Sequence, residues 1–162
     1  NRKQADGPVA REAVDLVELV ENVVAAHSLP ARAKLMHTEL TLQARRCLAE
    51  PALLISVMDN LYSNAVHYGA ESGNIRIHSY RYGEQVRIDV ANSGEPIPAA
   101  EKNMIFEPFY QGSHQRKGAV KGSGLGLSIA RDCVRQMQGE LSLVDAPAGQ
   151  VCFRITLPSA PE

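Results

Sequence analysis

Two asparagines in the stretch "MDNLYSNAVHYG", residues 58–69, have the type and the spacing to act together. Asn60 and Asn64 are four residues apart, so on a helix they share one face, with His67 within about 60° of them. Amide oxygens are hard ligands that suit magnesium, which takes one or two protein groups together with substrate phosphates and water. Asn also hydrogen-bonds to nearby backbone. The helix alone therefore leaves a metal site and a purely structural role open.

A glycine-rich segment, "KGSGLGLSIA", places Gly122, Gly124 and Gly126 directly before an expected helix. Free backbone N–H groups and the positive end of a helix dipole attract phosphate at such a position. The pattern GxGxG is weak evidence by itself, since no strand precedes it as a Rossmann motif requires. The Walker pattern and the sequence elements of Ser/Thr/Tyr kinases are absent. A flexible hinge without a ligand remains the alternative.

Two further segments carry polar groups that could meet a ligand. In "VANSGEPIP", Asn92 ends an expected strand and Gly94 allows a sharp turn, so the amide either holds the edge of a base or is an ordinary turn residue. In "GSHQRKGAVKG", Arg116, Lys117 and Lys121 precede the glycines. Alone they indicate a solvated loop, but beside a phosphate site they could clamp the outer phosphates.

The elements that must position these residues follow from hydrophobic periodicity and turn signals. Asp15 is a possible N-cap of the first helix, and Pro30 is expected near its end. Helices are predicted over 13–29, 50–68 and 124–139, a strand over 37–44, and hairpins over 74–94 and 140–158. Such an order predicts the α+β class, a two-layer sandwich whose mixed, mostly antiparallel sheet is covered on one face by three helices.

Composition excludes several kinds of protein. The 162 residues are 44% hydrophobic and 22% charged, as in an ordinary globular domain. A net charge of -1 argues against general nucleic-acid or membrane-surface binding. The three cysteines show no CxxC spacing, so a disulfide framework or a zinc site is not expected, and a reducing cytoplasmic setting is. We expect residues 1–8 to be a linker and 9–162 one domain, cut from a longer protein.

Taken in order, these segments resemble the ATP-binding catalytic domain of bacterial sensor histidine kinases, which shares the Bergerat-type ATP-binding fold with gyrase-, heat-shock-chaperone- and MutL-type ATPases. "NLYSNAVHYG" resembles the N box of that family, "VANSGEPIP" its first glycine box, "IFEPFYQG" its F box and "GSGLGLSIA" its second glycine box. The resemblance covers nearly the whole chain.

The resemblance implies ATP and Mg²⁺ as cofactors and assigns the residues to roles. Asn64, together with Asn60, would coordinate magnesium between the phosphates, with Lys117 as a third catalytic residue. Tyr68 would pack on adenine, and Phe106 and Phe109 would anchor a lid over the nucleotide. The implied nucleotide-binding residues are Asn64, His67, Tyr68, Asn92, Gly94, Ile97, Phe106, Phe109, Arg116, Lys121, Gly122, Ser123, Gly124, Leu125, Gly126 and Leu127.

Four positions differ from what relatives carry. Asn60 stands where gyrase-type ATPases have a general-base Glu, and an amide cannot be that base. Asn92 and Pro96 stand in a first glycine box that usually reads Asp-x-Gly-x-Gly. Losing the charged acceptor for the adenine amino group would weaken binding by roughly 1 kcal/mol, about fivefold. Gln111 replaces an Arg at the start of the lid.

The resemblance implies that the domain donates the γ-phosphate of ATP to a His on a separate dimerisation segment, for relay to an Asp of a response regulator. None of the five histidines lies in a phosphoacceptor motif. The expected partners are therefore the parent kinase's own dimerisation and phosphoacceptor domain and a response regulator, with no nucleic acid and no direct membrane contact. The expected parent is a homodimer in the bacterial inner membrane, with this domain on the cytoplasmic face. A stand-alone ATPase and a non-catalytic nucleotide-sensing or docking module are the alternatives.

Overall fold

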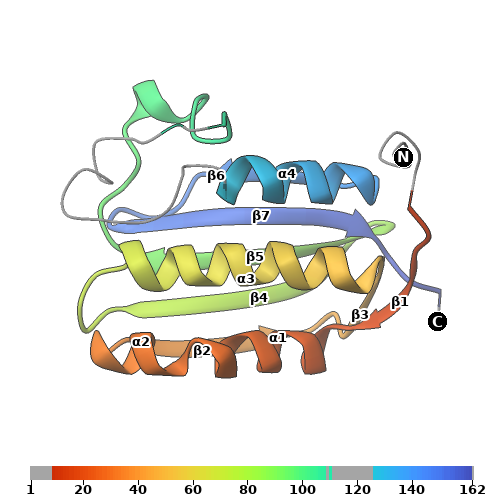
Figure 1. The fold of residues 1–162 in the computed structure, drawn as a ribbon, viewed down its shortest axis with the longest axis horizontal. Coiled ribbons are helices and arrows are strands. Elements are labelled where there is room, and N and C mark those ends of the chain that lie inside the picture. The colour runs from red at the N-terminus through yellow and green to blue at the C-terminus, as the bar shows by residue number, and fades with distance from the viewer. Residues whose placement is uncertain (1–8, 109, 111–125, 162) are drawn as a thin grey trace.

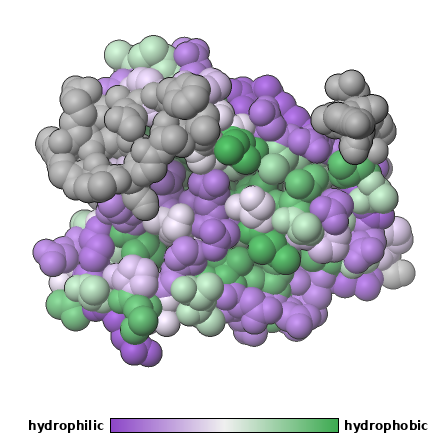
Figure 2. Space-filling model, in the orientation of Figure 1, coloured by the Kyte–Doolittle hydropathy of each residue, from purple (hydrophilic) through white to green (hydrophobic). Residues whose placement is uncertain are grey.

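A five-stranded sheet, a small two-stranded sheet and one layer of helices make up the part of the chain that the computed structural model describes, residues 9–108, 110 and 126–161. Figure 1 shows the three longer helices side by side across one face of the sheet. They are α1 (Leu16–Ala26), α3 (Pro51–Tyr68) and α4 (Gly126–Gln136). Figure 2 shows that hydrophobic side chains also reach the surface of this face. Ile55 on α3 and Ile129 on α4 are large hydrophobic residues that are about half-exposed.

The sheet is mixed, as predicted. Its strand order is β2-β4-β5-β7-β6, in which β2 runs parallel to β4 and every other neighbouring pair is antiparallel. Gly83, with φ +64°, makes the turn of the first predicted hairpin, where a left-handed backbone suits glycine. The strands are β2 (His37–Leu42), β4 (Asn74–Tyr82), β5 (Gln85–Ser93), β6 (Glu140–Val144) and β7 (Gln150–Pro158).

The N-terminal helix is shorter than predicted. Residues 12–15 form a strand, β1 (Glu12–Asp15), which pairs with β3 (Arg46–Ala49) in a second, two-stranded sheet. Asp15 does cap α1, accepting hydrogen bonds from the N–H groups of Val17 and Glu18. The predicted end near Pro30 is wrong, because that proline lies in the first turn of a separate short helix, α2 (Ser28–Ala33). A first turn tolerates proline, since its missing N–H would have no intrahelical partner.

Helix α3 lies at the centre of the helix layer, and the residues at its start favour helix formation there. Pro51 occupies its first turn, and the Glu50 carboxylate accepts a hydrogen bond from the N–H of Leu53. One side of the helix is buried against the sheet, as its apolar arc predicted, through Leu54, Val57, Met58, Leu61, Tyr62, Ala65 and Val66. A one-turn 3₁₀ helix (Ala99–Glu101) lies in the segment after β5. No helix among residues 9–108 and 126–161 is long and apolar enough to cross a membrane.

Buried thiols and phenols make the fold sensitive to alkali. Burial raises the pKa of the Cys47 thiol from 9.0 to about 12 and that of the Tyr68 phenol from 10.0 to about 12. Burial, followed by the Asp89 carboxylate, raises the pKa of Cys152 from 9.0 to about 11. The folded chain thus holds these protons more tightly than the unfolded chain does. Their contribution to stability is complete below the ordinary pKa of each group and is lost as pH rises through the raised value.

We therefore expect the free energy of unfolding, measured by urea titration, to fall steadily between pH 9 and 12. Cys47→Ala should lower stability at neutral pH, because it leaves a cavity, but should make the alkaline fall shallower. An unchanged alkaline slope in Cys47→Ala would assign the loss to other groups.

Candidate functional site

The face of α3 beside its buried arc carries the two asparagines. Asn60 and Asn64 are half-buried, whereas Leu61 and Ala65, one position further along, lie in the core. The Ser63 hydroxyl donates a hydrogen bond to the backbone carbonyl of Asn60, so the Ser63 side chain folds back onto the helix. The amides thus form a polar ridge at the edge of the core, as the periodicity predicted.

The start of α4 lies directly against this ridge. A Cβ placed on Gly126 would lie 2.6 Å from Oδ1 of Asn60, closer than real Cβ atoms approach an oxygen. The Asn60 amide therefore occupies space that any other residue at 126 would claim. Figure 1 shows the first turn of α4 beside the middle of α3, where Asn60 lies in the sequence of the helix. The N-terminus of one helix, with its positive dipole, thus meets the amide ridge of another.

The C-terminal end of α3 closes against the turn after β5. A Cβ on Gly94 would lie 3.2 Å from the carbonyl oxygen of Tyr68 and 3.6 Å from Cα of Gly69, so glycine permits this approach. His67 and Tyr68 are half-buried, and their rings meet edge to face at 4.5 Å between centroids. The first glycine box and the aromatic end of the N box are therefore neighbours in space.

Asn92 is buried at 8% exposure, on the strand that leads to this turn. Its Nδ2 donates a hydrogen bond of 3.0 Å to the backbone carbonyl of Ser93. That bond uses the amide nitrogen and holds the side chain in one orientation, which leaves Oδ1 as the acceptor. An amide oxygen is a group that can accept a hydrogen bond from an amino donor.

The segment after the turn is fixed to the core by Phe106. Its ring is buried and packs edge to face on Phe153 of β7, with centroids 6.1 Å apart. The guanidinium carbon of Arg131, on α4, lies 4.8 Å from the centre of the same ring. Ile97 and Leu127 are partly buried against the core. Arg131 was not singled out from the sequence, since nothing local connects it with a ring 25 positions earlier.

Several predicted site residues lie outside the described part of the chain. These are Phe109, Arg116, Lys117, Lys121, Gly122, Ser123, Gly124 and Leu125. The linker expected over residues 1–8 lies outside it as well. The described site therefore consists of the ridge on α3, the start of α4, the end of β5 and the Phe106 segment.

The described residues fit a cation held chiefly by phosphate and water. They contain no cluster of three or more His, Cys, Asp or Glu side chains that could hold a metal ion alone. What they offer is a pair of amide oxygens beside a helix N-terminus. Magnesium accepts such hard oxygen ligands and takes the remainder from substrate phosphates and water. The donor set thus suits a magnesium–phosphate group.

Sequence reasoning also missed Lys34. Its ammonium group donates hydrogen bonds to three backbone carbonyls at the end of α3, although it lies more than 30 positions away in the chain. No pattern around "ARAKLMH" signals this contact, because the acceptors are main-chain atoms that only tertiary folding brings near.

Comparison with known proteins gives a consistent result. The family model of "Histidine kinase-, DNA gyrase B-, and HSP90-like ATPase" matches residues 49–161. Sensor histidine kinase GlrK of Escherichia coli K12 is 71% identical over 99% of this chain and 34% of its own length. Sensor histidine kinase QseE of Escherichia coli O157:H7 is 70% identical over the same shares. The chain thus spans about a third of the curated relatives that it matches.

Solved structures agree on the fold. The catalytic domain of histidine kinase ThkA superposes with a TM-score of 0.79 and 29% identity, covering 95% of this chain and 100% of that one. ThkA in complex with the response regulator TrrA superposes with a TM-score of 0.77 and 27% identity, covering 93% of this chain and 42% of that one.

Proposed function

The chain belongs to the family of histidine kinase-, DNA gyrase B- and HSP90-like ATPases, and we propose that it binds Mg-ATP as the catalytic domain of a sensor histidine kinase. The observation that carries the proposal is the contact of the Asn60 amide with Gly126, which sets the ridge on α3 against the N-terminus of α4. That junction offers hard oxygen ligands and a positive helix end at one point, which is what a magnesium–phosphate group requires.

Each part of the site has a task in this proposal. Asn64 and Asn60 would hold the cation through their amide oxygens, while the start of α4 faces the phosphates. Bound magnesium supplies neutralisation of the phosphate charge. Buried Asn92, with its Nδ2 held by Ser93, would accept a hydrogen bond from the adenine amino group. Tyr68 would pack on the base beside it, and Phe106 would anchor the segment that covers the nucleotide.

The reaction that fits these groups is transfer of the γ-phosphate to a protein nucleophile. Phosphoryl transfer depends mainly on positioning and charge neutralisation. The domain itself therefore need not supply the nucleophile that accepts the phosphoryl group. Asn60 cannot take a proton from water as a Glu at that position could, which disfavours hydrolysis. We propose that the acceptor is a His on a dimerisation segment of the parent protein, and that the phosphate then passes to a response-regulator Asp. The parent would be a homodimer in the inner membrane, with this domain on its cytoplasmic side.

The test joins the chain to the dimerisation segment of its parent protein and supplies ATP labelled at the γ-phosphate. We expect acid-labile label on the His of that segment, and little free phosphate from this chain alone. Steady phosphate release by this chain alone would indicate a stand-alone ATPase instead. Tight nucleotide binding with neither product would indicate a nucleotide-sensing or docking module. Lys117 is the third proposed catalytic residue and lies outside the described part of the chain. Lys117→Ala should be tested in the same assay.

A further inference from the structure

The C-terminal end of α3 is held by a segment that lies far from it in the sequence. The Lys34 ammonium donates hydrogen bonds to the carbonyl oxygens of Val66 at 2.9 Å, His67 at 2.9 Å and Gly69 at 2.7 Å. Val66 and His67 belong to the last turn of α3. The carbonyls of a last turn accept no hydrogen bond from N–H groups of the same helix. A cation there also complements the negative end of the helix dipole.

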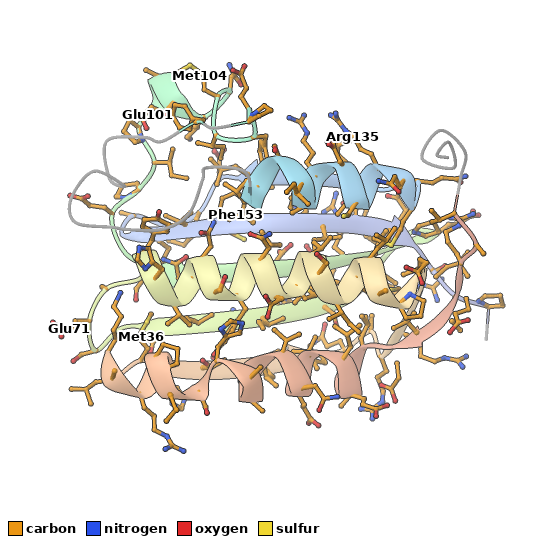
Figure 3. All side chains as sticks on the ribbon, viewed as in Figure 1. Met36, Glu71, Glu101, Met104, Arg135 and Phe153 are labelled. Atoms are coloured by element: carbon orange, nitrogen blue, oxygen red, sulfur yellow. The ribbon has the colours of Figure 1, made fainter. Side chains whose placement is uncertain are left out.

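The backbone around Lys34 continues this contact, which we call the Lys34 clasp (residues 34–37 against 66–73). The Ser72 N–H donates to the carbonyl of Lys34 at 2.8 Å, and the His37 N–H donates to the carbonyl of Gly73 at 3.0 Å. Leu35 and Ser72 both have left-handed backbones, with φ 57° and 62°, which non-glycine residues seldom adopt. Figure 3 labels Met36 and Glu71 at the end of the molecule where the clasp closes.

The clasp constrains the residues that face the nucleotide in the proposed site. The Val66 and His67 carbonyls belong to the two peptide groups that flank His67, and the Gly69 carbonyl belongs to the peptide group between Gly69 and Ala70. The clasp thus fixes the backbone directly before Tyr68 and again one residue after it. The Met36 side chain occupies the space that a Cβ on Gly69 would need, so the turn after Tyr68 is packed as well as hydrogen-bonded. Tyr68 in turn lies against Gly94, at the end of the strand that carries Asn92.

Lys34 itself cannot serve as a phosphate ligand in this arrangement. An ammonium group has three N–H donors, and three carbonyls accept from it. Its charge is therefore directed at the backbone of α3.

From this geometry we infer that Lys34 is a positioning residue for the adenine side of the site: it fixes the last turn of α3 so that Tyr68 and the first glycine box meet the base. The inference rests on the proposed nucleotide-binding function. It predicts that loss of the Lys34 ammonium group weakens binding of the base itself, with or without magnesium. Loss of the Asn64 amide should instead weaken only the part of the nucleotide affinity that depends on magnesium.

The test compares Lys34→Met with the native chain by calorimetric titration of ADP without magnesium and of a non-hydrolysable ATP analogue with magnesium. We expect both affinities to fall by about tenfold, comparable to one charge-assisted hydrogen bond. Lys34→Arg keeps the charge and should restore much of the affinity. Arg32→Met removes an exposed cation of the same segment and should bind like the native chain. Thermal unfolding of each variant is measured as well, to establish that the titration temperature lies below the midpoint of unfolding.

Equal nucleotide affinities for Lys34→Met and the native chain would overturn the inference and leave the proposed function intact. No nucleotide binding by the native chain would overturn both. If Lys34→Met does not fold, limited acetylation of the native chain tests the inference instead. Coupling between two sites is reciprocal, so if Lys34 affects nucleotide binding, bound nucleotide must also affect Lys34. Saturating nucleotide should then slow acetylation of Lys34. An equal rate at Lys34 with and without nucleotide contradicts the inference.

Discussion

Asn64→Ala should lower the magnesium-dependent affinity for a non-hydrolysable ATP analogue by roughly 100-fold, equivalent to about 2.7 kcal/mol, because it removes an amide ligand of the cation. Binding of ADP without magnesium should change little, since the base and the first glycine box remain. The chain itself should not be destabilised, because Asn64 is only half-buried and alanine is the better helix former. Calorimetric titration with and without magnesium measures both affinities.

Two variants make this result specific. Asn64→Asp keeps an oxygen ligand and should retain magnesium-dependent binding. Asn22→Ala removes an exposed asparagine from the middle of α1 and should behave like the native chain. If Asn64→Ala binds the analogue as tightly as the native chain does, and with the same magnesium dependence, the amide ridge is structural, as the sequence of the helix alone allowed.

Local signals account for the part of the fold that could be predicted from the sequence. Pro51 at the start of α3, the Asp15 cap of α1 and the turn at Gly83 each act within a few residues. The burial of Leu54 and Leu61 follows from helical spacing in the same way. The mixed sheet and its helix layer therefore followed from the order of the elements.

Contacts between distant segments account for what the sequence did not reveal. Strand β1 is only four residues long, and its pairing with β3 depends on a partner more than 30 positions away. The expectation that Pro30 lies near the end of the first helix is wrong because a proline can mark either end of a helix, and only the structure assigns it to the first turn of α2. Lys34 reaches main-chain carbonyls, which leave no trace in side-chain patterns. The types and spacing of the site residues were thus visible in sequence, but the residues that position them were not.

Gly126→Ala should reduce phosphotransfer in the joined protein by about tenfold, a change in barrier of roughly 1.4 kcal/mol, without loss of stability. The new Cβ would lie 2.6 Å from Oδ1 of Asn60, so the amide must rotate away from its place beside α4. That rotation is cheap for the fold, since the atom displaced is the end of a side chain. Alanine also loses less backbone freedom than glycine on folding, so the substitution should not destabilise the start of the helix. The variant thus displaces the Asn60 amide while leaving its chemistry intact.

A double-mutant cycle with Asn60→Ala isolates this mechanism, because residues in contact show non-additive effects. In the Asn60→Ala background the space beside Gly126 is open, and Gly126→Ala should then have little further effect on phosphotransfer. An equal loss in both backgrounds would mean that glycine is needed for the backbone of the α4 N-terminus and not for the amide. Ile129→Ala, half-exposed on the same helix, is the matched control and should leave the rate unchanged. Non-additivity between 60 and 126 would tie phosphotransfer to the junction of α3 and α4.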